Sequence, residues 1–144
     1  MKPPYPSFTS EWHDDTYQAI DPKQPKLSVK GKQVVISGGG AGIGRGITQA
    51  FADAGAASIA IMGRREAMLL ETKNEVTAKN STVSITTHVV DVTDSAAVKR
   101  AAGEISSWNI LISNAGYLPT PAPIADSDAR EWWKAFEVRA PLRP

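Results

Sequence analysis

Residues 34–44 read Val-Val-Ile-Ser-Gly-Gly-Gly-Ala-Gly-Ile-Gly, so an apolar run passes directly into a turn rich in glycine. In α/β proteins, such a turn between a buried strand and a helix binds a pyrophosphate. The glycines permit a tight turn, close approach of backbone N–H groups to phosphates, and close packing of helix on strand. The following helix adds its N-terminal amides and the positive end of its dipole. The stretch predicts a dinucleotide-binding site rather than a purely structural turn.

Strand and helix patterns alternate along the chain on both sides of this turn. Apolar and β-branched runs predict strands at 33–37, 58–62, 83–90 and 110–113. Helical periodicity predicts helices at 43–54 and 66–79, a third that begins at Asp94 or Ser95, and a fourth at about 127–138. This alternation implies right-handed crossovers, so we expect an α/β fold with a Rossmann-type doubly wound parallel sheet in the order 3-2-1-4.

Apolar residues at helical spacing predict the face that each helix buries. Gly55 follows the first helix in the position favoured after a helix C-terminus. The predicted inward residues of the first helix are Ile47, Ala50, Phe51 and Ala54. Those of the second helix are Met68, Leu69 and Val76, and those of the third are Val98, Ala101, Ala102 and Ile105.

Composition divides the chain into a proline-rich arm at 1–30, a nucleotide-binding domain at 31–138 and a tail at 139–144. The arm contains five prolines and no sustained hydrophobic period. Its candidate anchors onto the domain are the aromatic residues Tyr5, Phe8, Trp12 and Tyr17. A flexible tail without anchors is the alternative that composition leaves open.

The overall composition excludes several functional classes. A hydrophobic content of 42% and a charged content of 22% are ordinary for one globular domain of 144 residues. The net charge of +1 argues against a nucleic-acid partner, and no segment approaches the roughly 20 apolar residues of a membrane span. The chain has no cysteine, and His13 and His88 lack ligand-spaced partners, so we expect no metal site. We expect a cytoplasmic protein.

An arginine pair, Arg64 and Arg65, follows the second strand, twenty and twenty-one positions after Gly44. A site for NAD places a carboxylate there to accept from the ribose 2′-hydroxyl, whereas a guanidinium can bind the 2′-phosphate of NADP. The pair therefore favours NADP over NAD. Two alternatives remain: these are solvated residues at the start of a helix, or one of them pairs with Glu66.

Two further segments follow predicted strands. Asp91 and Val92 come after the third strand, where a carboxylate could bind the adenine amino group or simply shape a turn. Asp94 is better explained as a helix cap. Asn114-Ala115-Gly116 follows the fourth strand and keeps bulky side chains away from the place where a cofactor ribose would lie.

Together these segments resemble the short-chain dehydrogenase/reductase family over about Lys30 to Val138, and the proline-bearing start resembles fungal-type members. The cofactor motif Thr-Gly-x-x-x-Gly-x-Gly is matched at 37–44 with Ser37 in place of Thr, and Asn-Asn-Ala-Gly is matched at 113–116 with Ser113 in place of the first Asn. The cofactor-binding residues that the resemblance implies are Ser37, Gly38, Gly40, Gly42, Ile43, Gly44, Arg64, Arg65, Asp91, Val92, Asn114, Ala115 and Gly116. Ser37 is expected to make a turn and phosphate contact rather than to act as a nucleophile. Ala41 departs from the basic residue that many NADP users carry.

The family's catalytic residues have no counterpart in these 144 residues. Its chemistry uses a tyrosine as general acid/base with a lysine four residues later, because hydride transfer to a carbonyl leaves an alkoxide that must be protonated. Here Thr9, Asp21 and Pro121 lie four residues after Tyr5, Tyr17 and Tyr117. Arg139 stands where the family has the asparagine of its fourth helix. We therefore assign no catalytic residue.

The change of character after Val138 suggests a chain truncated before the catalytic Ser and Tyr-x-x-x-Lys, with only the N-terminal half of the fold. We expect an oxidoreductase lineage that uses NADP and a carbonyl or alcohol substrate, inactive in this form. The alternative is a non-catalytic module that binds NADP or a partner. The fourth strand is expected to form an unpaired edge of the sheet, with Ile110, Leu111 and Ile112 exposed on it, which predicts marginal stability or self-association.

Overall fold

A computed structural model describes residue 6, residue 8 and residues 16–139 of the chain. The strands are β1 (Gln33–Ser37), β2 (Ser58–Gly63), β3 (Ser84–Val89) and β4 (Ile110–Ser113). The α-helices are α1 (Gly42–Asp53), α2 (Glu66–Lys79), α3 (Ser95–Ile105) and α4 (Ala129–Arg139), and 3-10 turns lie at Gln18–Ile20, Pro25–Leu27 and Ile124–Asp126. All three strand pairings are parallel and the order is β3-β2-β1-β4, which confirms the predicted fold and topology.

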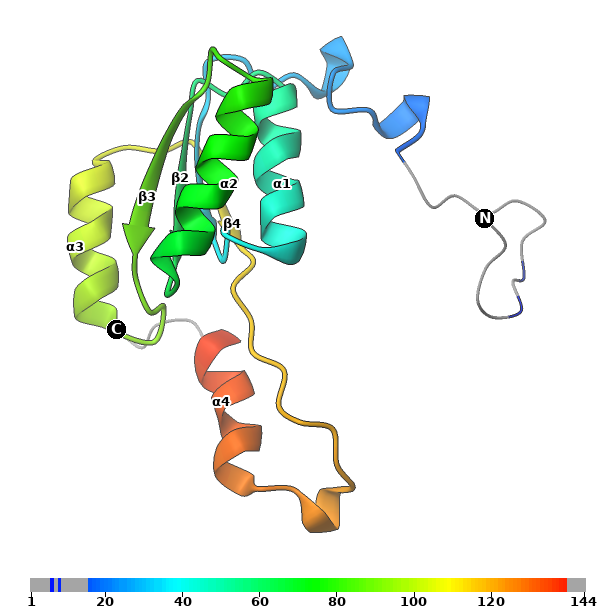
Figure 1. The fold of residues 1–144 in the computed structure, drawn as a ribbon, viewed down its shortest axis with the longest axis vertical. Coiled ribbons are helices and arrows are strands. Elements are labelled where there is room, and N and C mark those ends of the chain that lie inside the picture. Colours follow the sequence, from blue (N-terminus) through cyan, green and yellow to red (C-terminus); the bar gives the residue numbers. More distant parts are fainter. Residues whose placement is uncertain (1–5, 7, 9–15, 140–144) are drawn as a thin grey trace.

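Helices cover both faces of the sheet, with α1 and α2 on one side and α3 on the other (Figure 1). Successive side chains of the two central strands, β1 and β2, point to opposite faces of the sheet, so these strands contribute to an apolar core on each face. Val34 and Ile36 of β1 point towards α1 and α2, where Leu69 and Val76 pack against them. Val35 points the other way, towards Ala101 of α3. Because β1 and β2 are buried on both faces, their sequences are continuous apolar runs rather than alternating ones.

Side-chain caps set the starts of two helices. The Asp94 carboxylate accepts hydrogen bonds from the backbone N–H groups of Ala96 (2.9 Å) and Ala97 (3.0 Å), so Asp94 and not Ser95 caps α3. Asp128 accepts from the N–H groups of Arg130 and Glu131 in the same way. That cap starts α4 at Ala129, two residues later than predicted.

Ile47 and Phe51 of α1 pack against the core as predicted, but the most deeply buried residues of the helix are different ones. The buried residues of α1 are Gly44, Thr48 and Ala52, whereas Ile47 and Phe51 are only partly buried at the margin of the core. Small residues lie innermost because α1 passes very close to the end of β1. A Cβ at Gly44 would lie 2.0 Å from the carbonyl oxygen of Gly38. Periodicity of large apolar residues does not reveal such a close approach.

The fourth strand is less exposed than predicted. Ile110 and Ile112 pack against the core beneath α1 and α2, and only Leu111 is largely exposed, at 57%. The alternation of a strand explains this result, because Leu111 is the one of the three predicted apolar residues that points to the face that α3 leaves open beside β4. Beyond β4, the chain leaves the sheet and returns as α4, which extends below the sheet in Figure 1. Trp132 and Trp133 of α4 are both about half exposed.

The N-terminal segment joins the domain at Val29, whose N–H donates to the carbonyl of Ala54 (3.0 Å) and whose side chain packs on the core. Phe8 is fully exposed, so it does not anchor the arm, and Tyr17 is about half exposed. The other two candidate anchors, Tyr5 and Trp12, lie outside the described residues. No helix within residues 16–139 has the length and hydrophobicity of a membrane-spanning helix.

Candidate dinucleotide-binding site

A cleft of about 360 Å³ opens at the carboxyl ends of the strands. Five segments line it: the glycine turn, the end of β2 with the start of α2, the turn after β3, the turn after β4, and one residue of α4. The lining residues are Gly38, Gly40, Ala41, Ile43, Gly44, Gly63, Arg64, Arg65, Met68, Leu69, Val90, Asp91, Val92, Asn114, Ala115, Gly116 and Val138. In open α/β sheets, ligands bind at this edge where the strand order reverses, here between β1 and β4.

The structure brings nearly all of the predicted site residues to this cleft. All of them line it except Ser37 and Gly42. Sequence reasoning missed six lining residues, which are Ala41, Gly63, Met68, Leu69, Val90 and Val138. Met68 and Leu69 were identified only as core residues, yet the first turn of α2 also faces the cleft. Val138 reaches the cleft because of the course of α4, and no local sequence pattern indicates that course.

Two glycines fix the shape of the glycine turn. Gly38 has φ +70°, in the left-handed region, and a Cβ there would lie 2.9 Å from Nδ2 of Asn114. Gly44 packs its α-carbon directly against the Gly38 carbonyl. A side chain at either position would force the turn away from α1 or from β4. The turn therefore requires glycine at these positions for packing, independently of any ligand.

Ser37 joins the glycine turn to the turn after β4. Its Oγ accepts hydrogen bonds from the N–H groups of Asn114 and Ala115, each at 3.0 Å, and lies 3.4 Å from the carbonyl of Ile112. Asn114 returns the contact through Nδ2, which donates to the carbonyls of Ser37 (3.0 Å) and Gly38 (3.3 Å). The expected turn role of Ser37 is thus present. The hydroxyl is engaged with protein and lies outside the cleft lining, and its expected phosphate contact stays a prediction.

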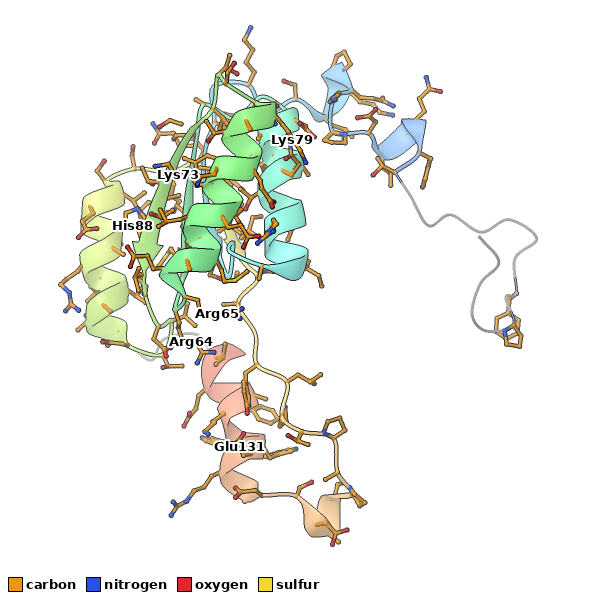
Figure 2. All side chains as sticks on the ribbon, in the orientation of Figure 1. Arg64, Arg65, Lys73, Lys79, His88 and Glu131 are labelled. Carbon is orange, nitrogen blue, oxygen red and sulfur yellow. The ribbon has the colours of Figure 1, made fainter. Side chains whose placement is uncertain are left out.

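The arginine pair projects at the same end of the sheet, beside the last turn of α4 (Figure 2). Arg64 Nη1 lies 3.9 Å from Asp91 Oδ2, and both side chains are substantially exposed. Among the described residues, neither Arg65 nor Glu66 forms an ion pair within 4.0 Å, so the predicted alternative of pairing with Glu66 is not observed. Arg65 thus presents an unpaired guanidinium to the cleft.

Asp91 has the turn role that the sequence left open, and its contact with the adenine amino group stays a prediction. It lines the cleft, and its Oδ1 accepts hydrogen bonds from the N–H (2.9 Å) and hydroxyl (2.8 Å) of Thr93, which makes it a turn residue. These hydrogen bonds, with a smaller contribution from Arg64, lower the pKa of Asp91 below its ordinary value. Asp91 is therefore a stable carboxylate at the edge of the cleft.

Helix α4 is attached to the segment after β4 by a polar contact. The Tyr117 hydroxyl donates to Glu131, which also pairs with Lys134. The contact with Glu131 raises the pKa of Tyr117, because the carboxylate accepts its proton and opposes ionisation. Tyr117 therefore stays a protonated donor and lacks the lowered pKa that a tyrosine base would need.

A doubly wound parallel sheet with a glycine turn after β1 and a cleft at the strand ends defines a Rossmann-type fold. A family model described as short chain dehydrogenase matches residues 32–140. The chain belongs to the short-chain dehydrogenase family, as its motifs predict.

Individual relatives agree with this assignment. The chain is 38% identical over 134 residues to the short chain dehydrogenase tazN of Aspergillus terreus, covering 90% of this chain and 29% of that protein. The chain spans less than half the length of the curated relatives that it matches most strongly.

Two similar solved structures contain different nicotinamide cofactors. L-sorbose reductase from Gluconobacter frateurii, complexed with NADPH and L-sorbose, has a TM-score of 0.67 and 27% identity over 78% of this chain and 43% of its own. A 3-ketoacyl-(acyl-carrier-protein) reductase from Brucella melitensis, complexed with NADH, has a TM-score of 0.65 and 26% identity over 78% of this chain and 46% of its own. These two neighbours therefore differ in the cofactor that they contain, one NADPH and the other NADH.

Proposed function

We propose that this chain is the cofactor-binding part of an NADP-dependent oxidoreductase, which moves hydride between the nicotinamide and a carbonyl or alcohol substrate. The observation that carries the preference for NADP is the position of Arg64 and Arg65 in the cleft. They lie after β2, where an NAD-specific site has a carboxylate. Arg65 is the better candidate for the 2′-phosphate, because Arg64 lies beside Asp91.

The residues present fit a dinucleotide. Ala41, the residue before α1, has no side chain that can cap the helix, so the first N–H groups of α1 remain available to a pyrophosphate at the cleft. Asp91 and Val92 would border the adenine, and Asn114 to Gly116 would border a ribose. When bound, the cofactor supplies the hydride chemistry. The protein's part here is to bind and orient it.

We propose further that the 144-residue polypeptide binds NADPH without turnover. It contains no Tyr-x-x-x-Lys, and Tyr117 is engaged with Glu131 as a hydrogen-bond donor. A non-catalytic role, as an NADP-binding or partner-binding module, is the second candidate, supported by the same observation. The cytoplasmic location predicted from composition stays part of this proposal, and imaging of a tagged protein would check it.

Titration calorimetry with NADPH and NADH tests the cofactor preference. We expect NADPH to bind more tightly than NADH, and Arg65→Ala to weaken NADPH binding by about 10- to 100-fold while leaving NADH binding unchanged, as the loss of a charge-assisted contact implies. Lys79→Ala is the matched control, since it removes one positive charge at the far end of α2 (Figure 2). Equal affinities for NADH and NADPH, or equal losses in both variants, would refute the preference. NADPH oxidation with any carbonyl substrate would refute inactivity.

A further inference from the structure

The middle of the glycine turn is held by a side chain of α2. The hydroxyl of Thr72 donates to the carbonyl of Gly40 at 3.0 Å, and Thr72 is fully buried. Arg45, in the first turn of α1, donates from Nε to the same hydroxyl at 3.1 Å and from Nη2 to the Gly40 carbonyl at 3.4 Å. One carbonyl of the turn is thus shared between two helices, and both hydrogen-bonding functions of the Thr72 hydroxyl are satisfied.

Two carboxylates of α2 hold Arg45 in this position. Its guanidinium forms ion pairs with Glu71 at 3.0 Å and with Glu75 at 3.2 Å. Glu71 and Glu75 lie one turn apart on α2, on either side of Thr72 in sequence, so Arg45 spans that part of the helix surface. The Arg45 side chain is 26% exposed, whereas Glu71 and Glu75 are 49% and 46% exposed, so Arg45 is the more sheltered partner of both ion pairs.

The glycine turn also packs against the backbone of α2. A Cβ at Gly40 would lie 3.1 Å from Cδ2 and 3.2 Å from the backbone nitrogen of Leu69. The same helix begins immediately after Arg65, and its first turn lines the cleft. A helix rises about 10 Å from Arg65 to Thr72, so α2 connects the arginine pair to the glycine turn as one rigid element.

We propose that Arg45 and Thr72 are positioning residues that set the spacing between the pyrophosphate-binding turn and the arginine pair. The inference rests on the proposed NADP site. Neither side chain lines the cleft, so both act through Gly40 and α2 rather than on the cofactor. A ligand that reaches both the turn and Arg65 needs the correct spacing, whereas a ligand that reaches only one of them does not.

The test compares NADPH with 2′-AMP, which carries the 2′-phosphate but no pyrophosphate. We expect Thr72→Val and Arg45→Met to weaken NADPH binding about tenfold, the effect of one lost hydrogen bond, and to leave 2′-AMP binding within about twofold of wild type. Thr72→Ser keeps the hydroxyl and should restore NADPH affinity. Thr77→Val, an exposed position on the same helix, is the matched control and should change neither affinity.

The outcomes separate the two proposals. Wild-type protein that fails to bind NADPH overturns the proposed function together with this inference. Wild-type protein that binds NADPH, with Thr72→Val and Arg45→Met binding it equally well, overturns the inference alone. Equal losses for NADPH and 2′-AMP also overturn it, because they would show a general destabilisation of the site. Arg45 is partly exposed, so Arg45→Met supplies a folded variant if the buried Thr72→Val does not fold.

Discussion

The two sides of the cleft are built from different kinds of structure. The first wall consists of the glycine turn, the end of β2 and the start of α2, and it rests on fully buried residues such as Ile61, Leu69 and Thr72. The second wall consists of residues 114–116 and Val138, and it continues into exposed chain, where Leu118 and Ile124 are more than four-fifths exposed. The groups proposed to bind phosphate all stand on the first wall, where packing fixes their positions.

The N-termini of the helices differ in a similar way, because those of α1 and α2 lack a side-chain cap and those of α3 and α4 have one. The residues before α1 and α2, Ala41 and Arg65, make no side-chain cap, and both helices begin at the cleft. Asp94 and Asp128 cap α3 and α4. A helix N-terminus left without a cap keeps its orphan N–H groups for another acceptor. The first wall therefore combines a rigid frame with unsatisfied donors, which is the arrangement that anion binding requires.

The largest effect should come from a methyl group added to the first wall. Gly44→Ala places a Cβ 2.0 Å from the carbonyl oxygen of Gly38, so the turn and α1 must move apart. We expect a loss of roughly 2–4 kcal/mol in the free energy of unfolding, as overpacking against backbone implies, and no measurable NADPH binding. Urea denaturation and calorimetry would measure the two effects.

Gly46→Ala provides the control in the same helix. Nothing lies within 4 Å of a Cβ at Gly46, and alanine favours a helix over glycine by about 1 kcal/mol. This variant should be as stable as wild type or more stable, with unchanged NADPH affinity. If both glycine variants behaved alike, the close approach of α1 to the turn would not be what shapes the first wall.

A smaller effect is expected from the cap of α3, outside both walls. Asp94→Ala removes the acceptor for the N–H groups of Ala96 and Ala97 and should cost about 1 kcal/mol of stability. NADPH affinity should stay within about twofold of wild type, because Asp94 does not line the cleft. Ser95→Ala should change stability by only a few tenths of a kcal/mol. A large loss in Ser95→Ala would instead identify Ser95 as the cap.

The sequence predicted those parts of the fold that a pattern of consecutive residues marks. The bounds of β1, β4 and α2 agree with the prediction, because uninterrupted apolar runs or strong helical periodicity bounded by turn residues mark each of them. The most deeply buried residues of α1 were not predicted, because small residues at a close approach have no hydrophobic signature. The contribution of Val138 to the cleft and the contact of Thr72 with Gly40 depend on tertiary structure, so no local pattern could reveal them.

Self-association should depend on the edge strand β4, which leads into the second wall, rather than on the first wall. β4 is the last strand of the sheet in the described part of the chain, and Leu111 on it is 57% exposed. An edge strand with one unpaired edge and an exposed apolar side chain favours pairing with another copy. Leu111→Lys should therefore lower the association measured by sedimentation velocity without weakening NADPH binding. A monomeric wild type with a sharp melt that is independent of concentration would contradict this prediction.

The smallest effect concerns the pH dependence of the attachment of α4. The pKa of Glu131 is lowered by Lys134 first and by Tyr117 second, so its contribution is present above the ordinary carboxyl pKa and is lost as pH falls through the lowered value. The pKa of Tyr117 is raised by Glu131, so its contribution is present below the ordinary tyrosine pKa and is lost as pH rises through the raised value. The attachment of α4 should therefore weaken at both acidic and alkaline pH.

Tryptophan fluorescence can follow this transition, because Trp132 and Trp133 lie on α4 close to Phe136. In a background with Trp12 and Trp108 replaced by phenylalanine, only the α4 tryptophans report. Tyr117→Phe should remove the alkaline transition and move the acidic one upward, since Glu131 loses one of the two hydrogen bonds that lower its pKa. Binding of NADPH to the first wall should change little across the acidic transition. A titration curve that is the same with and without the Tyr117 hydroxyl would show that this contact does not hold α4 against the second wall.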